Sequence, residues 1–280
     1  MKKSLIAVAL AGAFAMPAFA QTSSSDATGA PPAAEPAGPH TFTGNMTIAS
    51  DYRFRGISQT MGKPAIQGGV DYSHESGIYL GNWNSNVNEA TGYPGGSVEM
   101  DFYGGWKKTF AEDFGLDIGL LYYYYPGTDS GFYSPCNMKT LSCASGHIDN
   151  TEVYLGLSWK TLSFKWSHAI GDYFSIPDTS GTNYFDLSGT YDLGDGWGIL
   201  GHVGYTDLRG FESPTGNNGK YTDWKLGVTK DISGWVIGLA YVDTNAKDSN
   251  PGDPYYYVNT NGKSYNAGKA TAVLSVTKTF

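Results

Sequence analysis

The sequence predicts an all-β protein that forms a closed transmembrane barrel of about 12 antiparallel strands. Three observations lead to this prediction. An export signal opens the chain, no later segment is long and apolar enough for a membrane helix, and apolar and polar residues alternate in short segments from Thr41 to the end. Alternation with a period of two residues is typical of strands whose two faces meet different surroundings.

Residues 1–20 have the features of a signal peptide. Two lysines precede an apolar run over residues 5–16, and the sequence AFA at 18–20 is a small-x-small cleavage site. The run is shorter than the roughly 20 residues that span a membrane, which disfavours an anchor helix. Residues 21–40 lack periodicity and predict a flexible periplasmic leader, so residues 41–280 form the predicted barrel domain.

Charge and composition narrow the class of protein further. The formal net charge is −8, and removal of the two signal lysines leaves −10, which argues against nucleic-acid partners. The 38 Gly, 21 Tyr, 13 Phe and 7 Trp residues fit a β-rich chain with aromatic bands at membrane interfaces. A helical membrane protein is excluded, which leaves a secreted soluble protein or an outer-membrane barrel.

The first alternating segment shows the pattern most clearly. One face is apolar and comprises Phe42, Met46, Ile48, Tyr52 and Phe54; the other is polar and comprises Thr43, Asn45, Thr47, Asp51, Arg53 and Arg55. Residues 66–73 and 98–107 divide in the same way. Nine further segments begin near Ile78, Leu116, Thr151, Leu162, Tyr184, Trp197, Thr222, Trp235 and Lys269. The segments around Leu80 and Val236 alternate less cleanly, and we assign them no inward side.

The links between these segments alternate in length, apart from a modest first link over residues 58–63. Short links lie around residues 75–77, 111–113, 160–161, 194–196 and 231–234, whereas long links cover 126–150, 207–221 and 243–268. Outer-membrane barrels alternate short periplasmic turns with longer external loops, and a soluble sandwich has no such requirement. The last strand ends in an aromatic residue, as is typical of chains inserted into the outer membrane. Phe280 is therefore the predicted C-terminal signal for the assembly machinery.

Four motifs resemble one family. They are TGNMTIASDYRFRGISQT at 43–60, IQGGVDYSHESGIYLGNWNSNV at 66–87, EMDFYGGWKKTF at 99–110 and EVYLGLSWKTLSFKWSHAIGDYF at 152–174. In these the chain resembles the TorF-family porins of proteobacteria, also known as the Gcw_chp outer-membrane family. The resemblance covers nearly the whole predicted barrel and implies a pore-like protein of the Gram-negative outer membrane. It implies no substrate and no catalytic residues.

Charged residues on the polar faces are the candidate pore lining. They are Asp51, Arg53, Arg55, Asp71, Glu99, Asp101, Lys107, Asp117, Glu152, Lys165, Asp186, Asp223 and Lys225. Charge inside a barrel requires water or a partner, because an unpaired buried charge costs several kcal/mol. The residues therefore line a constriction that selects solutes, or they form a ladder of salt bridges that plugs the lumen. Their formal sum of −3 predicts a weak preference for cations in an open pore.

Cys136 and Cys143 lie in the longest predicted external loop. Thiols exported through an oxidising periplasm tend to pair, so we expect a structural disulfide. A metal site is disfavoured because only His147 lies nearby. The Asp-containing stretch 248–253 lacks the spacing of an EF-hand, and we assign neither a metal nor a cofactor.

Two other classes of function compete with the channel. A hydrolase needs a nucleophile beside a base, but the adjacent Ser167 and His168 point to opposite faces, and nothing in the sequence places His74 or His202 beside a serine. A structural or adhesive barrel with a plugged lumen is suggested by the tyrosine runs 122–125 and 255–257, although a membrane girdle accounts for these tyrosines. The sequence therefore favours a passive channel for small hydrophilic solutes, embedded in outer-membrane lipids, with no catalytic step. Neither the solute nor the oligomeric state is readable from it.

Overall fold

The computed structural model describes residues 38–110, 113–128, 136–143 and 146–280. The expected signal peptide and most of the expected leader lie outside the described residues. The last leader residue, His40, already belongs to the first strand. Within the described part of the chain, no helix is long and apolar enough to cross a membrane.

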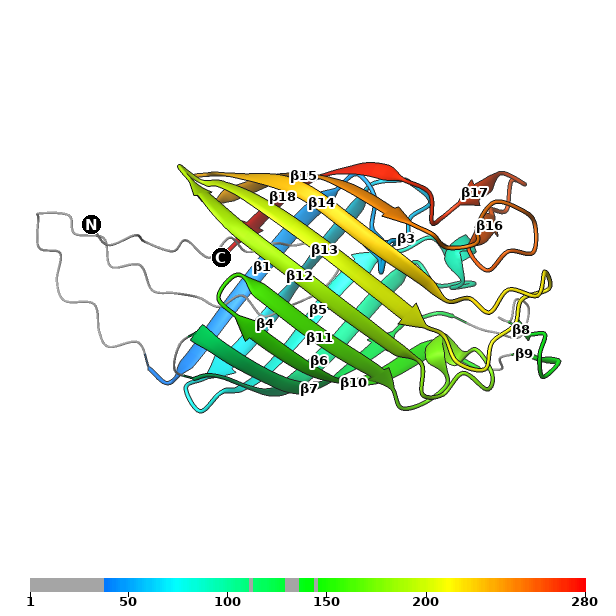
Figure 1. Ribbon diagram of the computed structural model, residues 1–280, viewed down its shortest axis with the longest axis horizontal. Coiled ribbons are helices and arrows are strands. Elements are labelled where there is room, and N and C mark those ends of the chain that lie inside the picture. The colour runs from blue at the N-terminus through cyan, green and yellow to red at the C-terminus, as the bar shows by residue number, and fades with distance from the viewer. Residues whose placement is uncertain (1–37, 111–112, 129–135, 144–145) are drawn as a thin grey trace, which may run out of the picture.

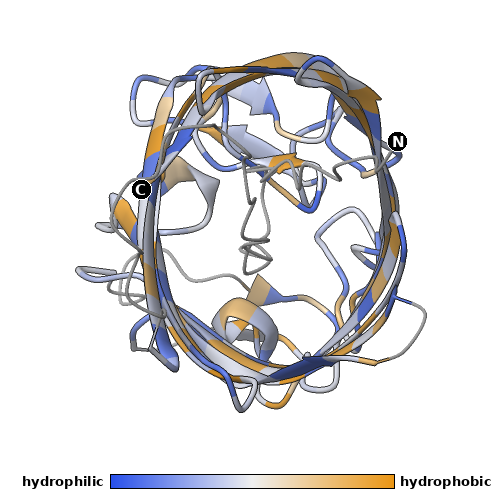
Figure 2. Ribbon diagram, turned by 90° about the vertical axis from the view of Figure 1, so that its left-hand side faces the viewer, coloured by the Kyte–Doolittle hydropathy of each residue, from blue (hydrophilic) through white to orange (hydrophobic). Residues whose placement is uncertain are grey.

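Twelve antiparallel strands form one closed barrel, as the sequence predicted. In chain order they are β1 (His40–Ala49), β4 (Ala65–His74), β5 (Ile78–Asn86), β6 (Val98–Thr109), β7 (Phe114–Tyr124), β10 (Asp149–Trp159), β11 (Leu162–Ala169), β12 (Asn183–Gly194), β13 (Trp197–Asp207), β14 (Tyr221–Ile232), β15 (Trp235–Thr244) and β18 (Thr271–Thr279). Each strand pairs with its neighbours in this order, and β18 pairs with β1 to close the ring, as seen along the barrel in Figure 2.

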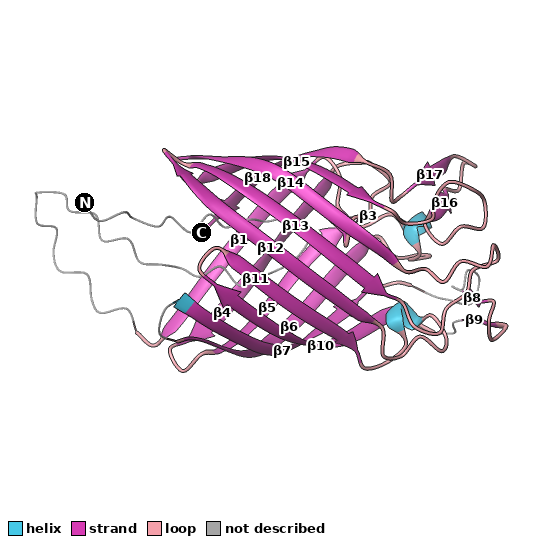
Figure 3. Ribbon diagram, viewed as in Figure 1, coloured by secondary structure: helices cyan, strands magenta, loops and turns pink. Residues whose placement is uncertain are grey.

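The two ends of the barrel differ (Figure 1). Short turns gather at the end where β18 finishes, which we call the turn end. Long connections gather at the opposite, loop end, and carry most of the remaining elements (Figure 3). These are the hairpins β2 (Arg53–Phe54) with β3 (Ile57–Ser58), β8 (Cys136–Asn137) with β9 (Ser142–Cys143) and β16 (Tyr256–Val258) with β17 (Ser264–Asn266), and the 3₁₀ turns η1 (Glu89–Thr91) and η3 (Tyr173–Ser175).

The outer face of the barrel is apolar. Ile66, Val70 and Leu226 are each more than 60% exposed, as expected for side chains that face lipid rather than a protein core. Aromatic side chains flank this band at both ends. Trp106, Trp159, Trp197 and Trp235 lie toward the turn end; Tyr122, Tyr124, Tyr205, Trp224 and Tyr241 lie toward the loop end. The predicted girdle accounts for only half of the run 122–125, because Tyr123 and Tyr125 point inward and are buried.

Tyrosines on the inner face lie over glycines of neighbouring strands. Tyr103 pairs with Gly81, and Tyr154 pairs with Gly119. A Cβ atom added to either glycine would overlap the tyrosine that covers it. These glycines therefore provide the space in which large rings lie flat against a curved sheet.

The first strand is shorter than the sequence suggested. We expected Tyr52 and Phe54 on the lipid-facing side, but β1 ends at Ala49 and both side chains are buried inside. Arg55 and Gly56 form the two-residue turn between β2 and β3, and both have positive φ, as a type I′ hairpin turn requires. Residues 50–64, which we call the inner loop, thus bend into the barrel instead of extending its wall.

The two strands that alternate less cleanly are now assigned. On β15, Val236, Gly238, Ala240 and Val242 point inward, and the large apolar residues between them point outward. Both faces of β15 are therefore apolar, which explains why its pattern is ambiguous in the sequence. On β5, Tyr79, Gly81, Trp83 and Ser85 point inward.

Candidate functional site

The inner loop crosses the barrel interior and contacts several of its walls. All residues from Asp51 to Met61 are buried. Backbone bonds join the loop to two other connections, from the Ser58 amide to the Ala267 carbonyl (2.9 Å) and from the Asn88 amide to the Gln59 carbonyl (2.8 Å). The loop is therefore a fixed part of the interior and narrows it.

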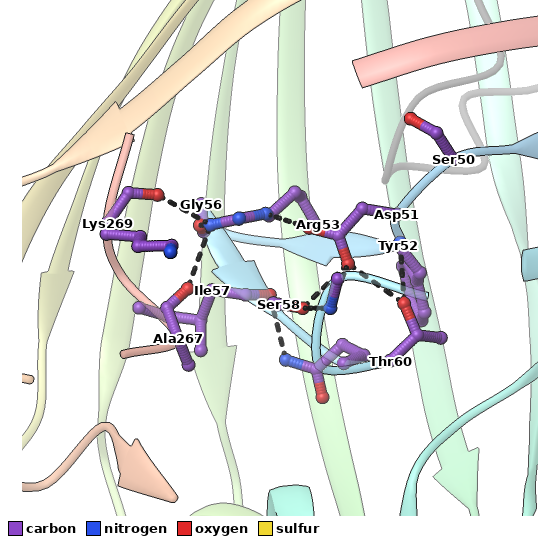
Figure 4. Close-up of polar contacts among 12 residues, drawn as sticks. Ser50, Asp51, Tyr52, Arg53, Gly56, Ile57, Ser58, Thr60, Ala267 and Lys269 are labelled. Atoms are coloured by element: carbon purple, nitrogen blue, oxygen red, sulfur yellow. Dashed lines mark hydrogen bonds and ion pairs between the residues drawn. The ribbon is translucent and has the colours of Figure 1, made fainter. Parts of the chain in front are cut away.

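Asp51 organises the inner loop (Figure 4). Its carboxylate accepts hydrogen bonds from Arg53 Nε at 2.5 Å, Ser58 Oγ at 2.7 Å and Thr60 Oγ1 at 2.9 Å. Arg53 Nη1 also donates to the carbonyl oxygens of Gly56, Ala267 and Lys269, at 2.8 to 3.1 Å. The Asp51–Arg53 pair thus closes the loop on itself and ties it to the segment before β18.

Arg55 anchors the opposite side of the loop to β10. Its Nη2 atom donates to both carboxylate oxygens of Glu152, at 2.8 and 2.7 Å, and its Nη1 atom donates to the Tyr173 hydroxyl at 2.9 Å. The guanidinium also lies 4.3 Å from the centre of the Tyr184 ring. Burial alone lowers the pKa of Arg55, but Glu152 and the surrounding tyrosines outweigh it and raise the pKa well above its ordinary value. Arg55 therefore stays charged in the interior.

A buried acidic pair lies beside this anchor on β6. Glu99 accepts hydrogen bonds from the hydroxyls of Tyr52 (2.6 Å) and Tyr125 (2.9 Å). Burial, followed by the charge of Glu99, raises the pKa of Tyr52 well above its ordinary value, so this tyrosine remains a donor. Asp101 is 6% exposed, and its Oδ1 atom has no hydrogen-bond partner among the described residues.

A second network of tyrosines and charges fills the interior toward the turn end. Tyr79 donates to Asp117 at 2.6 Å, and the hydroxyls of Tyr79 and Tyr154 also bond to each other. Tyr103 donates to Asp71 at 2.5 Å. The Nζ atoms of Lys165 and Lys107 lie 4.0 Å and 5.2 Å from the centres of the Tyr154 and Tyr79 rings. On this side of the lumen, charges are thus compensated by aromatic rings and hydroxyls.

His202 lies between two carboxylates on the neighbouring strands. Its Nδ1 is 2.9 Å from Asp186 and its Nε2 is 2.8 Å from Asp223. The Ser188 hydroxyl lies 3.1 Å from Nδ1 and donates to Asp186 at 2.6 Å. The sequence alone did not place a serine beside His202, but strand pairing brings Ser188 directly opposite it.

This Ser-His-Asp arrangement lacks what acyl transfer needs. Both ring nitrogens face carboxylates, so neither is available to remove a proton from the serine. Ser188 donates to an acid instead of the imidazole, and the backbone amides around it are engaged in the strand ladder rather than in an oxyanion hole. The geometry is that of a buried polar cluster that joins three strands.

The structure orients the predicted lining residues as follows. Those on strands all point inward: Asp71, Glu99, Asp101, Lys107, Asp117, Glu152, Lys165, Asp186, Asp223 and Lys225. Asp51, Arg53 and Arg55 instead belong to the inner loop. Sequence reasoning missed the tyrosines that bond to these charges. The sequence signal that could have identified these tyrosines is an inward glycine opposite an inward tyrosine, repeated on adjacent strands.

One cavity follows a wall of the lumen, along β13, β14, β15, β18 and β1. Its volume is about 90 Å³, and Arg53, Arg55 and Gly56 of the inner loop are among the residues that line it. This is small beside the roughly 300 Å³ or more of typical ligand pockets. The inner loop therefore leaves only a narrow space on this side of the barrel.

Cys136 and Cys143 form a disulfide across the β8–β9 hairpin at the loop end. Next to it, the fully buried Asn137 donates to the carbonyl oxygens of Pro177 and Gly210, which joins three long connections. Among the described residues, no three or more His, Cys, Asp or Glu side chains are arranged to hold a metal ion.

The sequence matches one known protein family. Residues 33–280 match the family described as "Bacterial protein of unknown function (Gcw_chp)". No curated protein matches the sequence. Similar solved structures include a KdgM porin in complex with disordered oligogalacturonate, with 6% identity over 85% of this chain and 98% of that one and a TM-score of 0.47. Another is Acinetobacter baumannii OccAB4, with 11% identity over 84% of this chain and 56% of that one and a TM-score of 0.41. The family match covers most of the sequence, and the chain belongs to the Gcw_chp family.

Proposed function

We propose that the protein is a narrow channel of the Gram-negative outer membrane for passive diffusion of small hydrophilic solutes, constricted by the inner loop. The observation that carries the proposal is the contrast between the two faces of the closed barrel. The outer face is apolar with aromatic bands, whereas the inner face holds charged side chains on strands and on a loop that bends inward. Charges gathered inside a membrane barrel indicate a polar pathway.

The surroundings of the proposed channel follow from the same features. Lipid covers the apolar band, and the turn end faces the periplasm. The C-terminal Phe280 lies there with a 73% exposed side chain, and its amide bonds to the Gly44 carbonyl at 2.8 Å. This supports its proposed role as a signal for the assembly machinery. The narrower assignment to the TorF porins rests on the four sequence motifs.

The channel should prefer cations weakly. The proposed lining carries a formal charge of −3, and protonation of His202 would reduce this to −2. The preference should fade with added salt, because the Debye length falls from about 10 Å at 0.1 M to about 3 Å at 1 M. No catalytic step is proposed, since the one Ser-His-Asp cluster described above offers neither a free base nor oxyanion donors.

Single-channel recording of the refolded protein in planar bilayers tests the proposal. We expect small, stable conductance steps and, in a gradient of potassium chloride near 0.1 M, a reversal potential of the sign for weak cation selectivity. Clear anion selectivity would contradict the charge count. Absence of current would favour the alternative supported by the buried inner loop, a plugged structural or adhesive barrel.

A further inference from the structure

The chemistry of the barrel interior varies around the ring. Tyrosines and charges fill the part formed by β4 to β10, and the polar cluster around His202 lies on β12 to β14. On the other side, β13, β15 and β18 present aliphatic side chains to the lumen, namely Leu200, Val236, Ala240, Val242 and Val273. An aliphatic wall is unexpected in a lumen that only hydrophilic solutes cross, because contact between water and aliphatic side chains is unfavourable.

The cavity lies against this aliphatic wall, and polar groups also line it. Hydroxyl groups of Thr229, Ser275 and Thr277 interrupt the wall, and the remaining lining includes Asp51, Arg53, Arg55, His202, Asp223 and Lys225. Its volume of about 90 Å³ is below that of an apolar cavity of about 150 Å³ that binds benzene in another protein. The space therefore suits an aliphatic group of a few carbon atoms, with charged and hydroxyl groups within reach of an attached head group.

We propose that this cavity is a binding step for small amphipathic solutes, which place a short branched aliphatic group against Val242 and Val273 and direct their polar head toward the inner loop. The inference rests on the proposed channel function and names its solute class. The aliphatic wall removes the apolar group from water, and the inner loop holds the solute against that wall as it passes. Solutes that lack an apolar group cross the lumen without this step.

Two matched pairs of blockers test the inference in single-channel recordings. Isovalerate is compared with acetate, and isobutylammonium with methylammonium, so that each pair shares its charge and differs in the aliphatic group. We expect the branched member of one or both pairs to block the current at a concentration about tenfold or more below that of the short member. The pair that shows the larger difference identifies the charge of the preferred head group.

Three variants locate the effect. Val242→Thr and Val273→Thr keep the side-chain shape but introduce a hydroxyl into the cavity wall. Each should remove most of the difference in blocking concentration between the branched and the short solute. Val87→Thr is the matched control, since Val87 is buried at the loop end and does not line the cavity. Unchanged migration of the unboiled variants on denaturing gels shows that the barrels have folded.

The results separate this inference from the proposed function. Normal salt current with equal block by both members of each pair would overturn the inference, whereas the proposed channel function would stand. If no salt current is seen, the proposed channel function is rejected. Saturation-transfer NMR with isovalerate and isobutylammonium on the folded protein in detergent then tests binding to the cavity by itself. A signal that is lost in Val273→Thr and kept in Val87→Thr supports the site, whereas no signal for either solute overturns it.

Discussion

The buried ion pair between Arg55 and Glu152 should be the main anchor of the inner loop. Both side chains are at most 2% exposed, and two hydrogen bonds join them. Replacement of Arg55 by Met would leave the Glu152 carboxylate buried without its cation, and would also remove the bond to Tyr173. Removal of one partner from a buried pair costs about 3–5 kcal/mol of folding free energy, so Arg55→Met should destabilise the protein by this amount.

Urea unfolding of the barrel in lipid vesicles, followed by tryptophan fluorescence, measures this cost. The double variant Arg55→Met/Glu152→Leu should recover part of the loss, because it leaves no unpaired charge. The matched control is the Lys220–Asp207 pair, whose N–O distance is 2.6 Å but whose side chains are 38% and 26% exposed. Lys220→Ala should cost less than about 1 kcal/mol. Equal losses for Arg55→Met and Lys220→Ala, or strictly additive losses at positions 55 and 152, would refute the anchoring role.

Three further predictions concern the whole barrel. Unboiled protein folded in detergent should migrate anomalously on a denaturing gel and shift on boiling, because the closed ladder of strand hydrogen bonds resists detergent; a helical far-UV spectrum would be inconsistent with this. The Cys136–Cys143 disulfide should form on export and contribute about 2–3 kcal/mol at most, mainly to local loop order. A variant with Ser at both positions should therefore still insert into the membrane. Alkylation of both thiols in unreduced wild-type protein would disprove the bridge. The free energy of unfolding should fall as pH rises from about 10 toward 12, because burial raises the pKa of Tyr173 to about 12 and unfolding returns it to about 10. An unfolding midpoint that is constant over this range would contradict the raised pKa of Tyr173.

The barrel was predictable because alternation reports on two surroundings that differ along most of the wall. Large apolar side chains such as Ile66 face outward, and charged ones such as Glu99 face inward, so each strand shows its orientation in its own sequence. Link lengths added independent information about the two ends. Alternation fails on β15 because the wall around Val236 and Val242 is apolar on both faces.

The inner loop was not predictable from alternation. Tyr52 and Phe54 alternate with charged residues as they would on a lipid-facing strand, but they meet other aromatic side chains inside the barrel. Local periodicity cannot distinguish these two apolar surroundings. Gly56 was a weak local signal, because glycine is typical of the second position of a two-residue hairpin turn, whereas Arg55 occupies a first position that usually holds Asn, Asp or Gly.

The charged residues of the interior were predictable, but their pairings were not. The sequence identifies inward charges, whereas the partner of Arg55 lies 97 positions away, and Ser188 meets His202 only through the register of β12 and β13. Such contacts depend on the order and shear of the closed sheet. For the same reason, the aliphatic wall of the lumen emerges only when the strands are placed around the ring.

Conductance after removal of the inner loop tests the central claim most directly. Ala49 pairs with Ala65, so replacement of residues 50–64 by Asn-Gly should join β1 to β4 through a two-residue turn and leave the wall intact. We expect the variant to fold, as judged by its gel shift, and to conduct several times more current per channel than the wild type. If the folded variant shows the wild-type conductance, the inner loop does not constrict the lumen, and the account of this protein as a loop-narrowed channel is contradicted.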